Sequence, residues 1–346
     1  ASHRGGDVFS LAYLLRQLNP AATPPQGAEG IAIARGCIDS RLAQPGDLFV
    51  ALPGERTDGH LFVGAALAAG AAVALVARPV EGLLTLDLAH PEGWPPAVRA
   101  PLAVQAPDPL AALQRLAGAY RRDHPALRVV GVTGSVGKTT AKEVIAAALT
   151  SRGPLLKSEG NANNEIGLPL TLLQAQPRQR LAVLEMGIYA LGEIALLCEI
   201  AQPQVGVVTN VGPVHLERLG NIERIAQAKA ELVRALPADG LAVLNGDDAR
   251  VRAMATLTPA PSLTYGLGTE NDVRALAVEP RGLEGISVRV QVRARADLGL
   301  AAGEMTLQSG LLGRHAALPV LAAVAVALAE GLGWQEIARG LEAAGP

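Results

Sequence analysis

The sequence predicts an α/β protein in which a small N-terminal α/β substrate domain precedes a P-loop-type, mostly parallel sheet with helices on both faces. Three observations support this fold class. Short apolar runs alternate with helical patterns along most of the 346 residues, which is typical of parallel sheets covered by helices. Apolar residues make up 49% of the chain, enough for more than one core. A glycine-rich turn directly follows one apolar run and opens a helix at Lys138.

The first expected domain covers residues 1–104. Its predicted elements are buried strands at 50–52, 73–76 and 102–104 and a helix at 60–69. A proline-rich stretch at 92–101 predicts a loop just before the domain boundary. The longest apolar run without a charge, 61–77, is shorter than the roughly 20 residues that a membrane-spanning helix needs, so no membrane span is expected.

The second expected domain covers residues 105–346 and begins with a helical pattern at 109–123. Beyond it, strand and helix patterns alternate, which predicts a parallel sheet. The strands are expected at 127–133, 181–185, 205–209 and 241–244, and the helices at 138–152, 192–200, 222–236 and 318–332. Alternating apolar positions within 273–308 predict antiparallel strands added at the edge of that sheet.

Composition excludes several classes of protein. The 30 basic and 32 acidic residues nearly cancel to a net charge of −2, which argues against a protein that binds nucleic acid through a basic face. The two cysteines, Cys37 and Cys198, are far apart in the sequence, so neither a disulfide framework nor a zinc site is expected. We therefore expect a cytoplasmic protein in which both thiols are buried.

A candidate phosphate-binding loop, Gly131–Thr140, follows an apolar strand and opens a helix. The backbone N–H groups of such a turn, together with a helix N-terminus, bind anions. Lys138 is positioned to reach the β- and γ-phosphates of a nucleoside triphosphate, and the Thr139 hydroxyl to bind Mg²⁺. Val132 stands where the strict motif has glycine. The alternative is a glycine turn that carries a solvated lysine.

Lys229 is one of only four lysines, and it falls on the apolar stripe of the helix expected at 222–236. The stripe consists of Ile222, Ile225, Ala226, Leu232 and Val233. A buried ammonium is costly unless it is paired, deprotonated or modified. Two interpretations stay open: a side chain that extends along the stripe to reach solvent, or a lysine whose charge is changed by chemistry.

Two further polar residues follow expected strands of the parallel sheet. Glu185 ends the strand at 181–185, and His215 follows the strand at 205–209 across a short turn. Ligands of such sheets bind at the carboxyl ends of the strands. A loop hydroxyl, a carboxylate and an imidazole at this edge would make a divalent-cation site. Taken singly, Glu185 is also compatible with a solvated loop residue and His215 with a helix cap.

In this order, the motifs resemble the Mur ligase family of ATP-dependent amide-forming enzymes of peptidoglycan synthesis. The most specific match is Asn161–Leu173, which resembles the MurF branch of that family. Other segments with the family's pattern lie on both sides of it, and the resemblance runs from residue 37 to the end of the sequence. These segments are Asp39–Arg41, Pro45–Val50, Gly54–His60, Glu185–Gly187, Gly192–Ile194, Thr209–Glu217, Ile225–Glu231 and Asn245–Asp248.

The resemblance implies ATP and Mg²⁺ as cofactors and suggests a role for each matching residue. The implied ATP-binding residues are Gly134, Ser135, Val136, Gly137, Lys138, Thr139, Thr140 and Asn245. Thr139 and Glu185 would hold one Mg²⁺, and His215 with a carbamylated Lys229 a second. The implied catalytic residues are Lys138, Glu185, His215 and Lys229. The implied substrate-binding residues are Asp39, Ser40, Arg41, Asp58, Gly59 and His60 for the UDP-linked part, and Asn163, Asn164 and Glu165 beside the reacting carboxylate.

The implied reaction joins D-alanyl-D-alanine to UDP-N-acetylmuramoyl-tripeptide through an acyl phosphate, and we expect a monomer. Two departures from the family's pattern bear on this expectation. Ala316 and Pro319 replace two asparagines on the adenine side. The sequence ends at Pro346, where the family's third domain is expected to begin, so we expect a two-domain piece or a shortened relative with reduced or no turnover. The alternatives are a MurE-type or folate-type ligase for another amino acid, and a non-catalytic nucleotide-binding relative.

Overall fold

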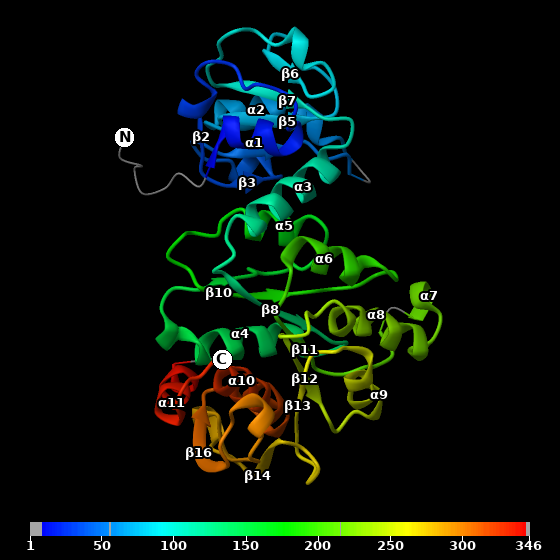
Figure 1. The fold of residues 1–346 in the computed structure, drawn as a ribbon, viewed down its shortest axis with the longest axis vertical. Helices are drawn as coiled ribbons and strands as arrows, with labels where there is room; N and C mark the ends of the chain where they lie inside the picture. Colours follow the sequence, from blue (N-terminus) through cyan, green and yellow to red (C-terminus); the bar gives the residue numbers. More distant parts are fainter. Residues whose placement is uncertain (1–8, 55–56, 215, 344–346) are drawn as a thin grey trace. The chain divides into compact units, whose positions relative to one another are not determined.

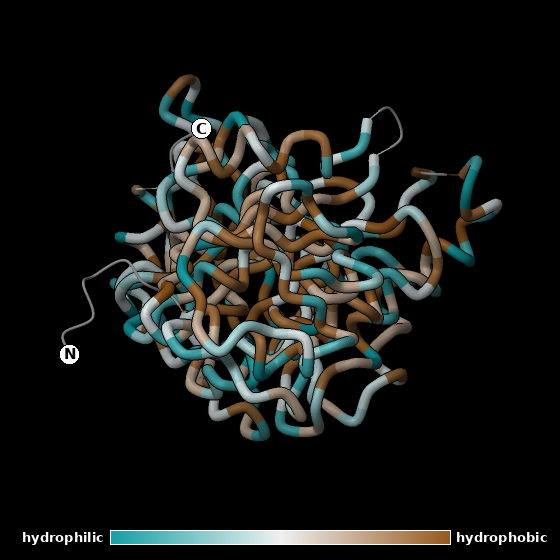
Figure 2. Tube along the Cα trace, turned by 90° about the horizontal axis from the view of Figure 1, so that it is seen from above, coloured by the Kyte–Doolittle hydropathy of each residue, from teal (hydrophilic) through white to brown (hydrophobic). Residues whose placement is uncertain are grey.

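The computed structural model of the chain describes residues 9–54, 57–214 and 216–343. It divides into two compact units, each of which has its own sheet (Figure 1). The first unit runs to His124 and includes residues 169–176, and the second comprises residues 125–168 and everything from Pro177 onward. Figure 2 shows the apolar segments in brown running through the interior of the trace, with hydrophilic segments at many of the outer turns.

The first unit is built on a parallel five-stranded sheet with the order β3-β4-β5-β7-β6. Its strands are β3 Gly36–Cys37, β4 Leu48–Val50, β5 Val73–Val76, β6 Thr85–Asp87 and β7 Leu102–Gln105. A separate antiparallel pair is formed by β1 Phe9–Ser10 and β2 Ala32–Ile33. The helices are α1 Leu11–Leu18, α2 Val63–Ala68 and α3 Pro109–Arg122, with 3₁₀ turns η1 Ala28–Gly30, η2 Ser40–Leu42, η3 Gly59–Phe62 and η4 Pro91–Gly93.

Helix α3 groups with the first unit, whereas the sequence pattern put the boundary before it, near residue 105. The reason is an aromatic contact between α3 and the segment of β1 and α1, which is distant from it in the sequence. The Tyr120 ring of α3 lies 5.7 Å from the Phe9 ring and 6.2 Å from the Tyr13 ring, measured between centroids. The Tyr13 hydroxyl also donates a hydrogen bond to Asp123 at 2.6 Å. Long-range packing of this kind leaves no local signal in the sequence.

The second unit is built on a nine-stranded sheet with the order β16-β15-β14-β13-β12-β11-β8-β10-β9. Pairing is parallel from β9 to β14 and antiparallel from β14 to β16. The strands of its first half are β8 Arg128–Thr133, β9 Leu156–Lys157, β10 Leu181–Glu185, β11 Val205–Val208 and β12 Leu241–Asn245. The others are β13 Ser262–Gly266, β14 Val273–Pro280, β15 Ile286–Val292 and β16 Gly303–Ser309. The predicted fold class and the antiparallel addition are thereby confirmed.

Helices cover both faces of this sheet (Figure 1). The helices of this unit are α4 Lys138–Ala148, α6 Glu193–Ala201, α7 Leu216–Leu219, α8 Ile222–Arg234, α9 Ala249–Ala253, α10 Ala317–Ala329 and α11 Trp334–Glu342. Helix α5 Gly167–Leu172 begins in this unit, and its residues from Pro169 onward belong to the first unit. The 3₁₀ turns are η5 Thr150–Arg152, η6 Met254–Leu257, η7 Gly282–Glu284, η8 Ala296–Leu298 and η9 Arg314–Ala316. Helices α4, α10 and α11 pack together over one face, and α6 packs on α8 over the other. In the described part of the chain, no helix has both the length and the apolar character needed to cross a membrane.

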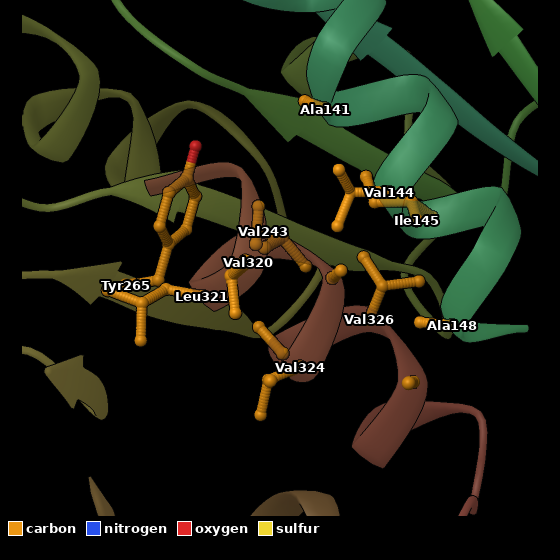
Figure 3. Packing of buried hydrophobic residues seen from close by; sticks show 14 of the residues in the cluster. Ala141, Val144, Ile145, Ala148, Val243, Tyr265, Val320, Leu321, Val324 and Val326 are labelled. Carbon is orange, nitrogen blue, oxygen red and sulfur yellow. The ribbon is translucent and has the colours of Figure 1, made fainter. Parts of the chain in front are cut away.

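The largest core of the second unit lies between the sheet and the layer of α4, α10 and α11. Figure 3 shows Val144, Ile145 and Ala148 of α4 close to Val320, Val324 and Val326 of α10, with Val243 and Tyr265 contributed by the sheet. Nine of the thirteen residues of α10 are buried because the helix is sandwiched between α4 and the strands. Alanine and valine dominate the helix, and their small size allows this close approach.

Two glycines bring helix α8 close to the opposite face of the sheet. A Cβ atom at Gly131 of β8 would lie 3.0 Å from Leu232 of α8, and one at Gly206 of β11 would lie 3.1 Å from the same side chain. Because successive strand residues point to opposite faces, the neighbours Val130 and Val132 enter the core under α4 instead. At position 131 the strand therefore presents only backbone to α8, while its two neighbours fill the core on the other face.

Candidate functional site

The phosphate-binding loop connects β8 to α4, and its two inner glycines have positive φ angles. Gly137 is the N-cap of α4 with φ +80°, and Gly134 has φ +155°. A Cβ atom at Gly134 would lie 1.8 Å from Oγ1 of Thr209, so only glycine fits there. Burial lowers the pKa of Lys138, and the negative charge of Glu185 acts in the opposite direction. The loop thus combines backbone donors, a helix N-terminus and a partly desolvated ammonium.

Asn210, to which we assigned no role from the sequence, fastens this loop to the end of β11. Its Oδ1 accepts hydrogen bonds from the backbone N–H groups of Ser135 at 3.2 Å and Val136 at 2.9 Å. Its Nδ2 donates to the Val136 carbonyl at 2.8 Å, as does the Thr209 hydroxyl at 2.9 Å. The signal that pointed to it was its position directly after a predicted strand, at the sheet edge where ligands bind.

Glu185 and Thr139 meet at the carboxyl edge of the sheet, as the strand-end pattern predicted. The Thr139 hydroxyl donates to Oε2 of Glu185 at 2.8 Å, and Nδ2 of Asn163 donates to Oε1 at 2.9 Å. Glu185 is only 2% exposed, so the interpretation as a solvated loop residue is wrong. Its backbone N–H donates to the Ser158 hydroxyl at 3.1 Å. A buried carboxylate is thus held on both oxygens and on its main chain.

Lys229 lies on α8 with 1% of its surface exposed, so the interpretation as a side chain that reaches solvent is wrong. It forms neither a hydrogen bond nor an ion pair with any residue that the structure describes. Burial, and secondarily the positive charge of Lys138, lower its pKa to about 7. At neutral pH a large fraction of this amine is therefore unprotonated and nucleophilic. His215, the residue paired with it in the sequence-based prediction, lies outside the described residues.

The donor set fits Mg²⁺ in its chemistry. Glu185 offers carboxylate oxygens and Thr139 a hydroxyl oxygen, the ligand types that Mg²⁺ prefers. A carbamate on Lys229 would add a second anion and remove the repulsion between Lys229 and Lys138. Within the described ranges, no group of three or more histidine, cysteine, aspartate and glutamate side chains is arranged to hold a metal ion.

Two cavities flank the phosphate-binding loop. One, of about 80 Å³, is lined by Lys138, Glu165, Gly187 and Tyr189 and by the two asparagines Asn163 and Asn164. Asn164 also accepts a hydrogen bond at 2.8 Å from the backbone N–H of Gly167, where α5 begins. The three residues expected beside the reacting carboxylate therefore share a cavity with the loop lysine. Tyr189, which the sequence did not single out, faces the same cavity.

The other cavity, of about 460 Å³, is mainly apolar and lies beside Val136, Gly137 and Thr140 of the loop. It is also lined by Ala316 and Pro319, the two residues that replace asparagines of the family's pattern. Asn245 lines neither of these two cavities. It is buried, and its Nδ2 donates to the Thr209 carbonyl at 2.7 Å.

The substrate-binding residues expected in the first unit lie in two 3₁₀ turns that both contact α2. Asp39 caps η2 and pairs with Arg41 at 2.6 Å, and this pairing lowers the Asp39 pKa to about 2. Asp58 caps η3 through the backbone N–H of His60 and pairs with Arg78 at 2.6 Å. Ser40 lies in η2 and Gly59 opens η3. Among the residues that the structure describes, none forms a hydrogen bond with the buried Nδ1 of His60.

Comparisons with known proteins bear on the whole chain. Residues 34–121 match a profile described as "Mur ligase family, catalytic domain", and residues 132–327 match one described as "Mur ligase middle domain". A UDP-N-acetylmuramoyl-tripeptide–D-alanyl-D-alanine ligase from Synechocystis is 38% identical over 91% of this chain and 62% of its own length. The ligase of that name from Mycobacterium tuberculosis is 40% identical over 89% of this chain and 60% of its own length. The chain thus spans about three fifths of the length of these relatives.

Solved structures agree with these matches. A MurF structure from Acinetobacter baumannii covers 97% of this chain and 68% of its own, with a TM-score of 0.79 and 30% identity. A MurF ligase from Thermotoga maritima in complex with ADP covers 88% of this chain and 65% of its own, with a TM-score of 0.70 and 29% identity.

Proposed function

The chain belongs to the Mur ligase family, and from this premise we propose that it is an ATP-dependent amide ligase of the MurF branch. It joins D-alanyl-D-alanine to UDP-N-acetylmuramoyl-tripeptide, as a cytoplasmic monomer. The names of its relatives support this pair of substrates, and the presence of ADP in a relative from Thermotoga maritima supports ATP as the phosphate donor. The UDP-linked substrate binds the first unit, and ATP binds the second.

ATP binds at the loop between β8 and α4. Its phosphates accept hydrogen bonds from the backbone of Gly134–Thr140, and the Lys138 ammonium neutralises charge on the β- and γ-phosphates. The base and ribose occupy the apolar cavity beside Ala316 and Pro319. Asn245 contributes indirectly, because it fixes the Thr209 carbonyl below the loop.

Two magnesium ions are proposed. Thr139 and Glu185 hold one, and His215 and a carbamylated Lys229 hold the other. When bound, Mg²⁺ neutralises phosphate charge that would otherwise repel the attacking carboxylate. The carbamate forms when the neutral Lys229 amine attacks carbon dioxide and loses a proton, which leaves an N-linked carboxylate.

The reaction proceeds in two steps. A carboxylate oxygen of the tripeptide attacks the γ-phosphorus of ATP, the bond to the β,γ-bridging oxygen breaks, and ADP leaves with that electron pair. The amine of D-alanyl-D-alanine then attacks the acyl carbon, phosphate leaves, and the nitrogen loses a proton. Lys138 and the loop N–H groups stabilise the charge that develops on the bridging oxygen. Asn163, Asn164 and Glu165 orient the reacting carboxylate in the smaller cavity.

The observation that carries this proposal is the burial of Lys229 close enough to Lys138 for the two charges to interact. Its lowered pKa makes the amine available to carbon dioxide near neutral pH. A buried lysine in an ordinary structural role has its ammonium paired with an acceptor. The described residues give the Lys229 ammonium no such acceptor, and carbamylation would supply a negative charge chemically.

Two measurements test the proposal on this chain. ¹³C NMR in labelled bicarbonate should show a carbamate signal that disappears in Lys229→Met. Calorimetry should show separate binding of ATP with Mg²⁺ and of UDP-N-acetylmuramoyl-tripeptide, and Lys138→Ala should lose only the first. A chain with no carbamate signal and no binding of either ligand would overturn the assignment.

A further inference from the structure

A second buried lysine, Lys142, has no role in the proposed chemistry. It lies on α4, one turn after Lys138, and is 1% exposed. Unlike Lys229, it is paired: its Nζ donates to the Ser158 carbonyl at 2.6 Å and lies 3.0 Å from Oε1 of Glu143. The Glu143 side chain is 44% exposed, so only the lysine end of this pair is buried, and the contact with the Ser158 carbonyl is its main internal partner.

Ser158 connects Lys142 to the buried carboxylate of the site. This residue follows β9, is fully buried, and donates its backbone N–H to the Val183 carbonyl of β10 at 3.2 Å. Its carbonyl accepts from Lys142, while its hydroxyl accepts from the backbone N–H of Glu185 at 3.1 Å. One residue therefore holds the lysine of α4 on one side and the main chain of Glu185 on the other.

A second link runs in parallel at the surface. The other oxygen of Glu143, Oε2, lies 2.7 Å from Nζ of Lys157, the last residue of β9. Helix α4 is thus joined to the end of β9 by a buried contact and by a partly exposed ion pair. The same helix carries Thr139, whose hydroxyl must meet the Glu185 carboxylate on β10.

We propose that Lys142 and Ser158 are positioning residues that fix the Glu185 carboxylate relative to Thr139, and so set the affinity of this site for the divalent cation. The inference rests on the proposed function and deepens it. Sites of this kind need their oxygens held within roughly 0.5 Å of the productive position. The Lys142–Ser158–Glu185 chain adds directional hydrogen bonds to the apolar packing of α4 on the sheet.

The test uses Mn²⁺ as the probe, added to the chain with ADP and followed by calorimetry and by the EPR signal of free Mn²⁺. Lys142→Met removes the ammonium at similar volume, and Ser158→Ala removes only the hydroxyl. Each should weaken Mn²⁺ binding about tenfold or more, the usual effect of losing a residue behind a metal ligand. ADP binding in EDTA should remain close to that of the parent. The double variant should lose no more than the more affected single variant, because both act through one chain.

Arg128→Met provides the matched control. It breaks another partly buried ion pair, in which Arg128 lies 2.6 Å from Glu330. Arg128 begins β8 at the end opposite the loop, and Glu330 caps the end of α10. It should lower stability and leave Mn²⁺ affinity unchanged. If Lys142→Met does not fold, Ser158→Ala decides. Folded variants that bind Mn²⁺ as the parent does, or a control that weakens binding equally, would overturn this inference and leave the proposed function in place. A parent that binds neither ADP nor Mn²⁺ would overturn the proposed function and this inference with it.

Discussion

Replacing Lys229 by methionine should stabilise the second unit of the chain at neutral pH. The side chain is 1% exposed, and its pKa falls from the ordinary 10.5 to about 7 on folding. Folding is therefore less favourable at neutral pH, because it removes the Lys229 ammonium from water. Methionine has a similar length and no charge, so Lys229→Met removes this cost without leaving a large cavity.

The size of the effect follows from the two pKa values. At 1.36 kcal/mol per pKa unit, the cost of Lys229 is about 4 kcal/mol at pH 7 and about 1 kcal/mol at pH 9.5. Below pH 7 the amine is protonated in both states, and the cost is fully present. Between pH 7 and 10.5 the unfolded chain binds a proton that the folded chain has lost, so stability rises with pH. The free energy of unfolding should therefore rise by about 3 kcal/mol between pH 7 and 9.5 in the parent relative to Lys229→Met.

Urea unfolding in buffer free of carbon dioxide measures this difference. The chain has two tryptophans, Trp94 in the first unit and Trp334 in α11 of the second. In a Trp94→Phe background, the fluorescence of Trp334 reports on the unit that contains Lys229. Added bicarbonate should stabilise the parent at pH 7 and leave Lys229→Met unchanged, because the carbamate replaces the costly ammonium.

Two results would refute the reasoning. If parent and Lys229→Met have parallel stability curves from pH 7 to 9.5, the Lys229 pKa is not lowered in the folded chain. If Lys229→Met is less stable than the parent at every pH, the ammonium has a stabilising partner. Either result removes the physical basis for carbamylation at this position.

Three other substitutions test the packing and the loop. Gly134→Ala should abolish calorimetric binding of ATP with Mg²⁺, because its Cβ would lie 1.8 Å from Oγ1 of Thr209. Gly137→Ala has open space around its Cβ and should lower stability by only about 1–2 kcal/mol, because its backbone is left-handed. Asn210→Ala should leave loop groups without partners, costing about 1–3 kcal/mol in urea unfolding and weakening nucleotide binding. Leu321→Ala in the buried face of α10 should cost about 2–5 kcal/mol in the same unfolding assay, with no change in nucleotide affinity per folded molecule.

The parts of the fold that the sequence predicted well are those with a strong local period. The strand before Gly134, the helix after Lys138 and the strand that ends at Glu185 each carry an apolar pattern of sufficient length. Parallel strands end at the same sheet edge, so the meeting of Thr139 and Glu185 also followed from the pattern. The antiparallel strands after Val273 were visible from their alternation.

The parts that could not be predicted depend on short elements or on distant contacts. Strand β9 has two residues, too few to show a period, and β13 lacks a run of strongly apolar residues. Nothing was predicted for Lys142 from the sequence, and its burial and its contact with the Ser158 carbonyl are visible only in the tertiary structure. Asn210 acquires its role from a loop more than seventy residues earlier in the sequence.

The glycines under helix α8 have a consequence for the acidity of Lys229. Because residues 131 and 206 are glycines, α8 packs directly against the main chain of β8 and β11. Leu232 and the helical turn before it are therefore deeply buried. An extra methyl group on either strand would lift that turn, admit water beside the amine and return its proton affinity towards that of a free lysine. The pKa of Lys229 thus depends on Gly131 and Gly206, two uncharged strand residues.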